Sequence, residues 1–174
     1  MDCQLLSNGT VICEQTYGFW IQTGAISVSA IAAILLIYDA HSTARKRATI
    51  DLVLQQKLDA VLIDAKKKFS ALRKHHQANP DNSFTSYACD LNAPENECIF
   101  IVLNNYEFAA AGIRNGAFDE KSYKRMLYSL VVKDWDALKG YVTELRTKRS
   151  HLTLFQEFEW LAERWKLSPL EVNK

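Results

Sequence analysis

The chain has 174 residues, of which 48% are hydrophobic and 24% are charged, so it is long enough for one domain and a further short segment. Its 21 Lys and Arg residues nearly balance its 20 Asp and Glu residues, and the formal net charge is +1. This balance excludes a strong overall field that would steer the protein toward nucleic acid or acidic ligands.

An uncharged apolar run, FWIQTGAISVSAIAAILLIY, occupies residues 19–38. At about 1.5 Å per residue a helix of this length extends roughly 30 Å, the thickness of a bilayer core. We therefore predict a transmembrane helix over 19–38 with the lipid bilayer as its partner, a short outer tail over 1–18 and a cytoplasmic domain over 39–174. The alternatives are a cleaved signal peptide and a buried helix of a soluble protein.

Basic residues lie on one side of this run only. Residues 1–18 contain no Lys or Arg, whereas Arg45, Lys46 and Arg47 follow the run closely. The positive-inside rule then orients the N-terminus outside and the C-terminal domain in the cytoplasm. We predict a single-pass protein of the bacterial inner membrane.

Four cysteines fall into two pairs on either side of the run. Cys3 and Cys13 flank Asn8-Gly9, which is a signal for a two-residue hairpin turn. A disulfide between Cys3 and Cys13 is expected in the oxidising outer compartment, and the alternative is two unpaired thiols. Cys89 and Cys98 should stay reduced in the cytosol.

Small or hydrogen-bonding side chains recur within the apolar run at steps of three and four positions. They are Gln22, Ala25, Ser29, Ala32 and Ala33. Such a face lets membrane helices approach one another closely, so we predict that copies of the chain associate through it. The alternative is that small residues are simply common in membrane helices.

Helical periodicity continues after the run. It predicts an amphipathic helix over 54–72, a loop over 75–96, a core helix over 97–113, two helices or one bent helix over 123–145, and a last helix opened by a capping box at 153–156. Asp119 is expected to cap the helix that follows Asn115-Gly116. Since no stretch after the outer tail alternates as a strand does, the predicted fold class is all-α, with a helical bundle after the transmembrane helix.

Polar residues interrupt the predicted core helix and need hydrogen bonds if they are buried. We predict a buried polar network formed by Asn104, Asn105, Glu107 and Arg114. Such a network would fix the register of the helices, and the alternative is a binding or catalytic site.

Catalytic motifs are scarce. The sequence has no P-loop, dinucleotide fingerprint, HExxH, GxSxG or EF-hand pattern. Arg146 and His151 fit the loose R-x4-H pattern of the HEPN ribonucleases, in which a histidine could act as general acid or base on RNA and an arginine could stabilise phosphate charge. The alternative is a basic helix end that offsets the helix dipole and faces anionic lipid. We expect neither a cofactor nor a metal site, His75-His76 included.

Two segments, LNNYEFAAAGIRNGAFDEKSYKRM and TLFQEFEWLAERW, resemble a bacterial and prophage family of unknown function, the domain-of-unknown-function family 4760. The resemblance covers roughly residues 97–166 and implies a membrane-anchored helical protein. In overall plan the chain is also similar to the membrane accessory proteins of RNA-targeting CRISPR systems, a likeness that implies a pore for antiviral defence.

The function we predict is that of a membrane-anchored homo-oligomeric effector or interaction protein. It would act through assembly or a protein partner, as a pore or permeability factor in phage defence. One alternative is a membrane-tethered HEPN-like ribonuclease that uses Arg146 and His151, in which case RNA is the partner. A non-catalytic scaffold is the other.

Overall fold

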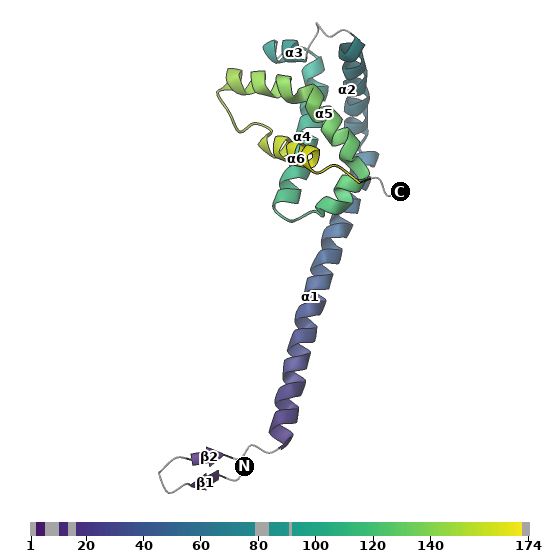
Figure 1. The fold of residues 1–174 in the computed structure, drawn as a ribbon. Coiled ribbons are helices and arrows are strands. Elements are labelled where there is room, and N and C mark those ends of the chain that lie inside the picture. The colour runs from purple at the N-terminus through teal and green to yellow at the C-terminus, as the bar shows by residue number, and fades with distance from the viewer. Residues whose placement is uncertain (1–2, 6–10, 14–16, 79–83, 91, 172–174) are drawn as a thin grey trace. The chain divides into compact units, whose positions relative to one another are not determined.

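The computed structural model describes residues 3–5, 11–13, 17–78, 84–90 and 92–171 (Figure 1). The chain divides into two compact units, Met1–Thr43 and Ala44–Lys174, which we call the N-terminal unit and the helical domain. The all-α prediction is confirmed: after a small hairpin at the N-terminus, every regular element is a helix within the described residues.

The hairpin lies in the N-terminal unit. Its strands β1 (Cys3–Leu5) and β2 (Val11–Cys13) pair antiparallel, with Cys3 opposite Cys13. The predicted turn at Asn8-Gly9 lies outside the described residues, and so do the side chains of the two cysteines. The disulfide therefore stays a prediction, although its two positions are register partners.

The apolar run belongs to the long helix α1 (Tyr17–Leu58). A helix of this length forms because neither Pro nor Gly interrupts it after Gly24. It ends next to Asp59, whose carboxylate accepts hydrogen bonds from the backbone N–H groups of Val61 (2.9 Å) and Leu62 (3.1 Å). Asp59 thereby caps the start of α2 (Ala60–Ala78) and marks the boundary between the two helices.

The predicted loop over 75–96 is wrong in part. Helix α2 continues to Ala78, and the short helix α3 (Thr85–Cys89) lies inside the predicted loop. Phe84, just before α3, is buried and packs on Phe69 of α2 with ring centroids 5.6 Å apart. Hydrophobic packing thus orders a segment whose composition is typical of a loop.

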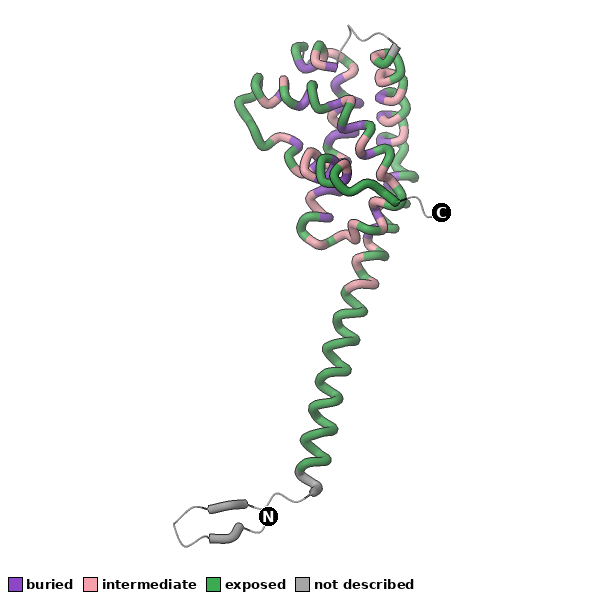
Figure 2. Tube along the Cα trace, viewed as in Figure 1, coloured by how far each residue is buried: buried purple, intermediate pink, exposed green. Residues whose placement is uncertain are grey.

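Helix α4 (Glu95–Arg114) is the core helix that the sequence predicts, and it packs against α2, α3 and α6. Its buried residues include Ile99, Val102, Leu103 and Ala110, which are fully covered. Figure 2 shows the buried positions concentrated in the helical domain. The remaining helices are α5 (Glu120–Arg149) and α6 (Gln156–Leu167), and these also pack against each other.

Two predictions at helix starts have different outcomes. Asp119 caps α5, as predicted, and accepts a hydrogen bond from the N–H of Ser122 at 2.8 Å. The capping box at 153–156 is wrong, because α6 begins after Phe155, which has a left-handed backbone (φ 56°) and makes no side-chain cap. The segment over 123–145 is one continuous helix, within α5.

Candidate functional site

The apolar part of α1 is uncovered. All residues from Trp20 to His41 are exposed, and they include Ile21 (73%), Leu36 (71%) and Ile37 (69%) (Figure 2). Leaving a large apolar side chain in water costs about 1.5–3 kcal/mol relative to burying it. Helix α1 is long and apolar enough to cross a membrane by length and composition. The predicted association residues Gln22, Ala25, Ser29, Ala32 and Ala33 all lie in this exposed stretch.

The serines of this stretch bond within the helix. The hydroxyl of Ser29 donates to the carbonyl of Ala25 at 2.8 Å, and that of Ser27 donates to Thr23 at 2.9 Å. Their polarity is therefore compatible with an apolar surrounding, because both hydroxyl protons are satisfied.

The last four turns of α1 belong to the helical domain and are bonded to the turn between α4 and α5. The guanidinium of Arg45 donates to the carbonyl of Phe118 at 3.2 Å, and the hydroxyl of Thr49, which is buried, accepts from the N–H of Asp119 at 2.7 Å. Hydrogen bonds from Ser122 lower the pKa of Asp119, and the charges of Arg45 and Lys46 act in the same direction. These polar contacts join the C-terminal part of α1 to the α4–α5 turn within the helical domain.

A glycine permits the α4–α5 turn to fold back. A Cβ at Gly112 would lie 2.2 Å from the ring of Phe118, which is too close for any side chain. Phe118 in turn packs edge-on against Phe108, with centroids 6.0 Å apart, although Phe108 itself is 62% exposed.

A buried charge cluster joins three helices and was missed by the sequence analysis. Arg73 of α2 forms an ion pair with Asp134 of α5, and the side chains are only 11% and 8% exposed. The hydroxyl of Tyr106 on α4 donates to the other carboxylate oxygen of Asp134 at 2.7 Å, and burial raises the pKa of this tyrosine. The sequence signal for this cluster is that Asp134 lies on the apolar helix face that includes Val131, Trp135 and Leu138.

The four residues of the predicted polar network differ in burial. Asn104 and Arg114 are exposed, whereas Asn105 and Glu107 are half-buried. Glu107 accepts hydrogen bonds from the N–H groups of Glu157 (3.3 Å) and Phe158 (2.8 Å), so it caps α6 from a neighbouring helix. Burial raises the pKa of Glu107.

Arg114 takes part in a separate contact. Its guanidinium binds both carboxylate oxygens of Glu157, at 3.0 and 2.9 Å. Glu107 and Arg114 thus both act on the first turn of α6, without a direct bond between them among the described contacts. Through these contacts, Glu107 and Arg114 help to hold the start of α6 against α4.

The R-x4-H residues, Arg146 and His151, lie at the end of α5 and just after it, and they differ in burial. Arg146 donates to the carbonyl of Leu154 at 2.8 Å and pairs with Glu159 at 2.7 Å, and its side chain is 15% exposed. His151 is exposed, and its backbone N–H donates to the carbonyl of Arg146 at 3.1 Å. The guanidinium of Arg146 therefore holds the α5–α6 connection through its Nε and one of its terminal nitrogens.

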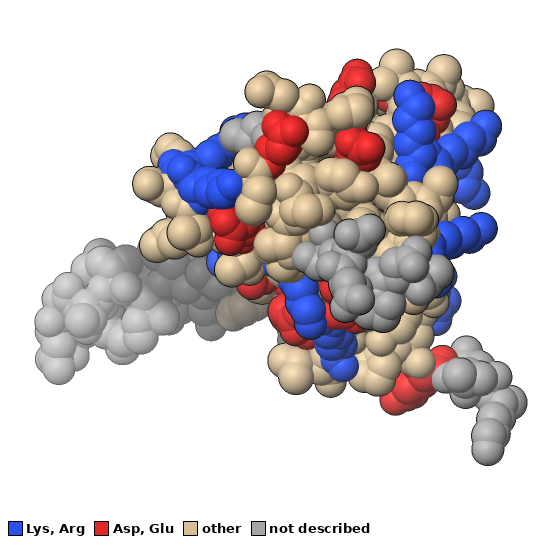
Figure 3. Space-filling view, turned by 90° about the horizontal axis from the view of Figure 1, so that it is seen from above, with Lys and Arg blue, Asp and Glu red and all other residues tan. Residues whose placement is uncertain are grey.

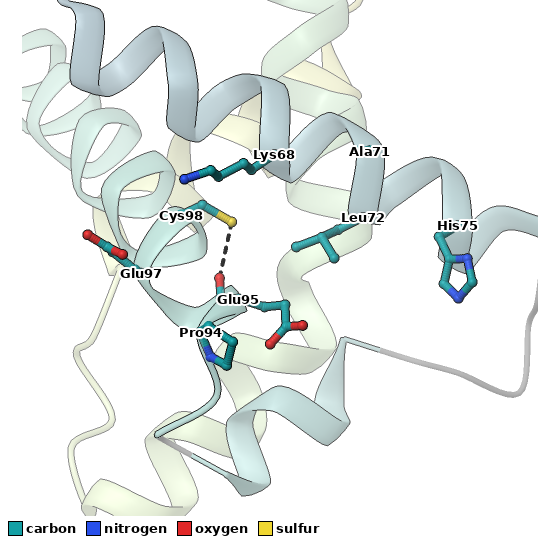
Figure 4. A pocket seen from close by; sticks show the side chains of 8 residues that line it. All are labelled: Lys68, Ala71, Leu72, His75, Pro94, Glu95, Glu97 and Cys98. Carbon is teal, nitrogen blue, oxygen red and sulfur yellow. Dashed lines mark hydrogen bonds between the residues drawn. The ribbon is translucent and has the colours of Figure 1, made fainter.

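A groove of about 530 Å³ lies between α2 and the start of α4 (Figure 4). Lys68, Leu72 and His75 line one wall and Pro94, Glu95 and Cys98 the other. The thiol of Cys98 donates to the carbonyl of Glu95 at 3.1 Å, and burial raises the pKa of this thiol. A thiol in this state is a poor nucleophile.

The surface charges are mixed. On the face shown in Figure 3, basic and acidic side chains are interspersed over the helical domain, in keeping with the near-neutral composition. Within the described residues no group of three or more His, Cys, Asp or Glu side chains gathers as a metal site would require.

The fold and the site define a class: a chain with a long, exposed apolar helix and a small helical-bundle domain. The chain belongs to the family described as a domain of unknown function, DUF4760, whose model matches residues 23–165. The match begins inside the apolar part of α1, so this helix is part of what the family shares. No curated protein and no solved structure matches the chain. The similarity to CRISPR accessory proteins gains no support from these comparisons.

Proposed function

We propose that this protein is anchored in the bacterial inner membrane by α1 and acts by assembly, with its helical domain in the cytoplasm as a binding module. The observation that carries the proposal is the uninterrupted exposure of apolar side chains from Trp20 to Tyr38. A lipid bilayer covers such a helix on all sides, whereas a soluble bundle would bury one face of it. Because the family match begins at residue 23, it extends through most of this helix, which supports a retained anchor over a cleaved leader.

Three features support the orientation with the N-terminus outside. The basic residues Arg45, Lys46 and Arg47 follow the apolar run, and residues 1–18 carry none. Cys3 and Cys13 are paired in register in the hairpin, where an oxidising compartment would permit a disulfide. The cysteines of the helical domain, Cys89 and Cys98, are both free thiols, which fits a reducing cytoplasm.

Self-association is the second part of the proposal. The face formed by Gln22, Ala25, Ser29, Ala32 and Ala33 would let α1 helices of two copies pack closely. In its most specific form, the proposal is that the assembled helices act as a permeability factor in phage defence. The order of the chain supports this role, because an apolar helix precedes a domain in which Arg146, the best catalytic candidate, forms a hydrogen bond and an ion pair with its own domain.

The anchoring is tested by membrane fractionation and by protease treatment of intact spheroplasts. We expect the protein in the membrane fraction after alkaline carbonate washing, with a C-terminal tag protected until the cells are lysed. A chain recovered in the soluble fraction would overturn the anchor. A tag that is cleaved from outside would overturn the orientation only.

The permeability role is tested by inducing the chain in cells that carry a dye sensitive to membrane potential. We expect depolarisation that depends on residues 22–33, so Gln22→Leu with Ser29→Leu, which alters this face, should reduce it. An oligomeric protein that leaves the potential unchanged would contradict the pore and favour the scaffold.

A further inference from the structure

The groove between α2 and α4 extends beyond its main hollow (Figure 4). A smaller hollow of about 70 Å³ adjoins it, because Lys68, Pro94, Glu97 and Cys98 line both. We call the two hollows together the α2–α4 groove. Its α2 wall is a single helix face whose residues recur in steps of four and three positions, namely Val61, Ala65, Lys68, Leu72 and His75. At 1.5 Å per residue this wall extends roughly 21 Å.

Apolar groups form the floor of the α2–α4 groove. The side chain of Cys98 is buried, Leu72 and Ile101 are half-buried, and Ala71 and Pro94 are exposed, so the groove is open to solvent. Every residue that lines it belongs to α2, to α4 or to the position just before α4, and no other helix of the described residues contributes. An open hollow between two packed helices is a place where a third helix packs in a bundle.

The charges that line the α2–α4 groove do not balance. Lys68 forms an ion pair with Asp64 at 2.8 Å, whereas Glu95 and Glu97 form no ion pair with any described residue. Both lie in the first turn of α4, where the helix dipole favours the ionised carboxylate. In Figure 4 their carboxylates lie on either side of the Cys98 thiol. The apolar floor is therefore bordered by two negative charges that lack a positive partner.

We propose that the α2–α4 groove binds an amphipathic helix of a partner protein. Its apolar side chains enter the groove, and its Lys or Arg side chains pair with Glu95 and Glu97. Pockets for small molecules enclose most of the ligand, whereas this groove is open and as long as about four helical turns, which suits a helix. The inference rests on the proposed role of the helical domain as a binding module, and it names the chemistry of the partner.

Fluorescein-labelled peptides test the proposal with the full chain in nanodiscs of zwitterionic lipid. The probe is a stapled helix of about 14 residues with a leucine stripe flanked by lysines, and the matched control has glutamate at every lysine position. The dissociation constant of the lysine peptide should be lower by about tenfold or more, since the carboxylates of the groove attract one peptide and repel the other. Empty nanodiscs give the background from lipid. Equal affinities, or no binding above that background, would overturn the proposal.

A blocking variant tests whether the lysine peptide occupies the groove. Ala71→Trp should raise its dissociation constant by about tenfold or more, because the indole fills part of the groove. Ala60→Trp is the matched control, since Ala60 is also exposed on α2 but does not line the groove. Because both alanines are exposed, the unfolding midpoint should stay close to that of the wild type. Equal binding by the two variants would contradict the proposed site.

A charge variant tests the role of the two glutamates without changing the shape of the groove. Glu95→Gln with Glu97→Gln should raise the dissociation constant of the lysine peptide by about threefold or more, since two ion pairs are lost. Asp51→Asn with Glu171→Gln removes the same charge at two other exposed positions and should leave the affinity unchanged. The same loss of affinity in both double variants would show that only the overall charge matters, and it would overturn the assignment to Glu95 and Glu97.

These outcomes are separable from those of the anchoring test. Fractionation and protease treatment do not involve the groove, so loss of peptide binding leaves the anchor standing. A soluble chain that binds the lysine peptide would overturn the anchor alone. If Ala71→Trp converts a wild-type oligomer into a monomer, the groove holds a second copy of this chain, and the proposal of a separate partner is overturned.

Discussion

The hydroxyl of Tyr106 donates a hydrogen bond of 2.7 Å to the carboxylate of Asp134, whose other oxygen is paired with Arg73. The three residues come from α4, α5 and α2, so a single buried carboxylate joins three helices. Removing one partner from a buried ion pair leaves the other charge uncompensated, which costs far more than the pair contributes to stability. Substitutions that remove one partner from this cluster should therefore strongly destabilise the helical domain.

We expect Asp134→Asn to lower the free energy of unfolding by roughly 3–5 kcal/mol, because Arg73 is left buried without its counter-ion. Tyr106→Phe should cost less, about 1–3 kcal/mol, since it removes one hydrogen bond to a charged group. The measurement is denaturant unfolding of the full chain in mild detergent.

The matched control is Asp136→Asn, two positions along the same helix. Asp136 pairs with Lys166 at the surface, where both side chains are partly exposed, so its loss should cost at most about 1 kcal/mol. Equal effects at positions 134 and 136 would contradict the role given to the buried pair.

Gly112 and Gly140 provide a second contrast, because both lie inside helices but in different surroundings. Gly112→Ala should destabilise the protein by about 1–3 kcal/mol, as its Cβ would overlap the Phe118 ring. Gly140→Ala should stabilise it by about 0.5–1 kcal/mol, since the nearest atom to the new Cβ is the Thr85 hydroxyl at 3.5 Å. In thermal unfolding, the midpoint temperature should fall for Gly112→Ala and rise for Gly140→Ala.

The Gly112 prediction has its own internal check. Phe118→Ala should recover part of the loss caused by Gly112→Ala, because the smaller residue vacates the place of the new Cβ. Additive effects of the two substitutions would show that Phe118 is not the obstacle.

Local patterns predict much of this fold, and contacts between distant residues account for what they miss. The apolar run, the core helix α4 and the cap at Asp119 each depend on neighbouring residues, and the sequence predicts all three. The start of α6 was misplaced at Thr153 because the group that caps it is Glu107, which lies about fifty positions earlier and on another helix. No local pattern contains that information.

The candidate sites also differ in whether local sequence patterns predict them. The exposed face of α1 can be predicted from spacing alone, because it depends only on neighbouring residues of the same helix. The pairing of Arg73 with Asp134 joins residues that are 61 positions apart, and their types alone suggest two solvated charges. Asn104 and Arg114 were expected inside because α4 is apolar almost all round, yet each occupies its narrow exposed side.

The raised pKa of Glu107 predicts how pH acts on the domain. Burial favours the protonated carboxyl in the folded state, so the folded protein holds its proton to a higher pH than the unfolded chain does. The contribution of Glu107 to stability is therefore complete below the ordinary glutamate pKa and is reduced as pH rises through the folded value. Unfolding of wild type and Glu107→Gln between pH 4 and 7 should show this decline in the wild type and a flatter profile in the variant. A steeper profile in the variant would contradict the assignment.

The two cysteines of the helical domain should react at very different rates. Cys89 is exposed, whereas the thiol of Cys98 is buried, donates to the carbonyl of Glu95 and has a raised pKa. Since the thiolate is the reactive form, a maleimide at pH 7 should label Cys89 rapidly and Cys98 only slowly in the folded protein. Cys89→Ser should therefore abolish the fast phase, and denaturant should release one further thiol of this domain. Fast labelling that persists in Cys89→Ser, with Cys3 and Cys13 also replaced by Ser, would show that the groove between α2 and α4 opens in solution and exposes Cys98.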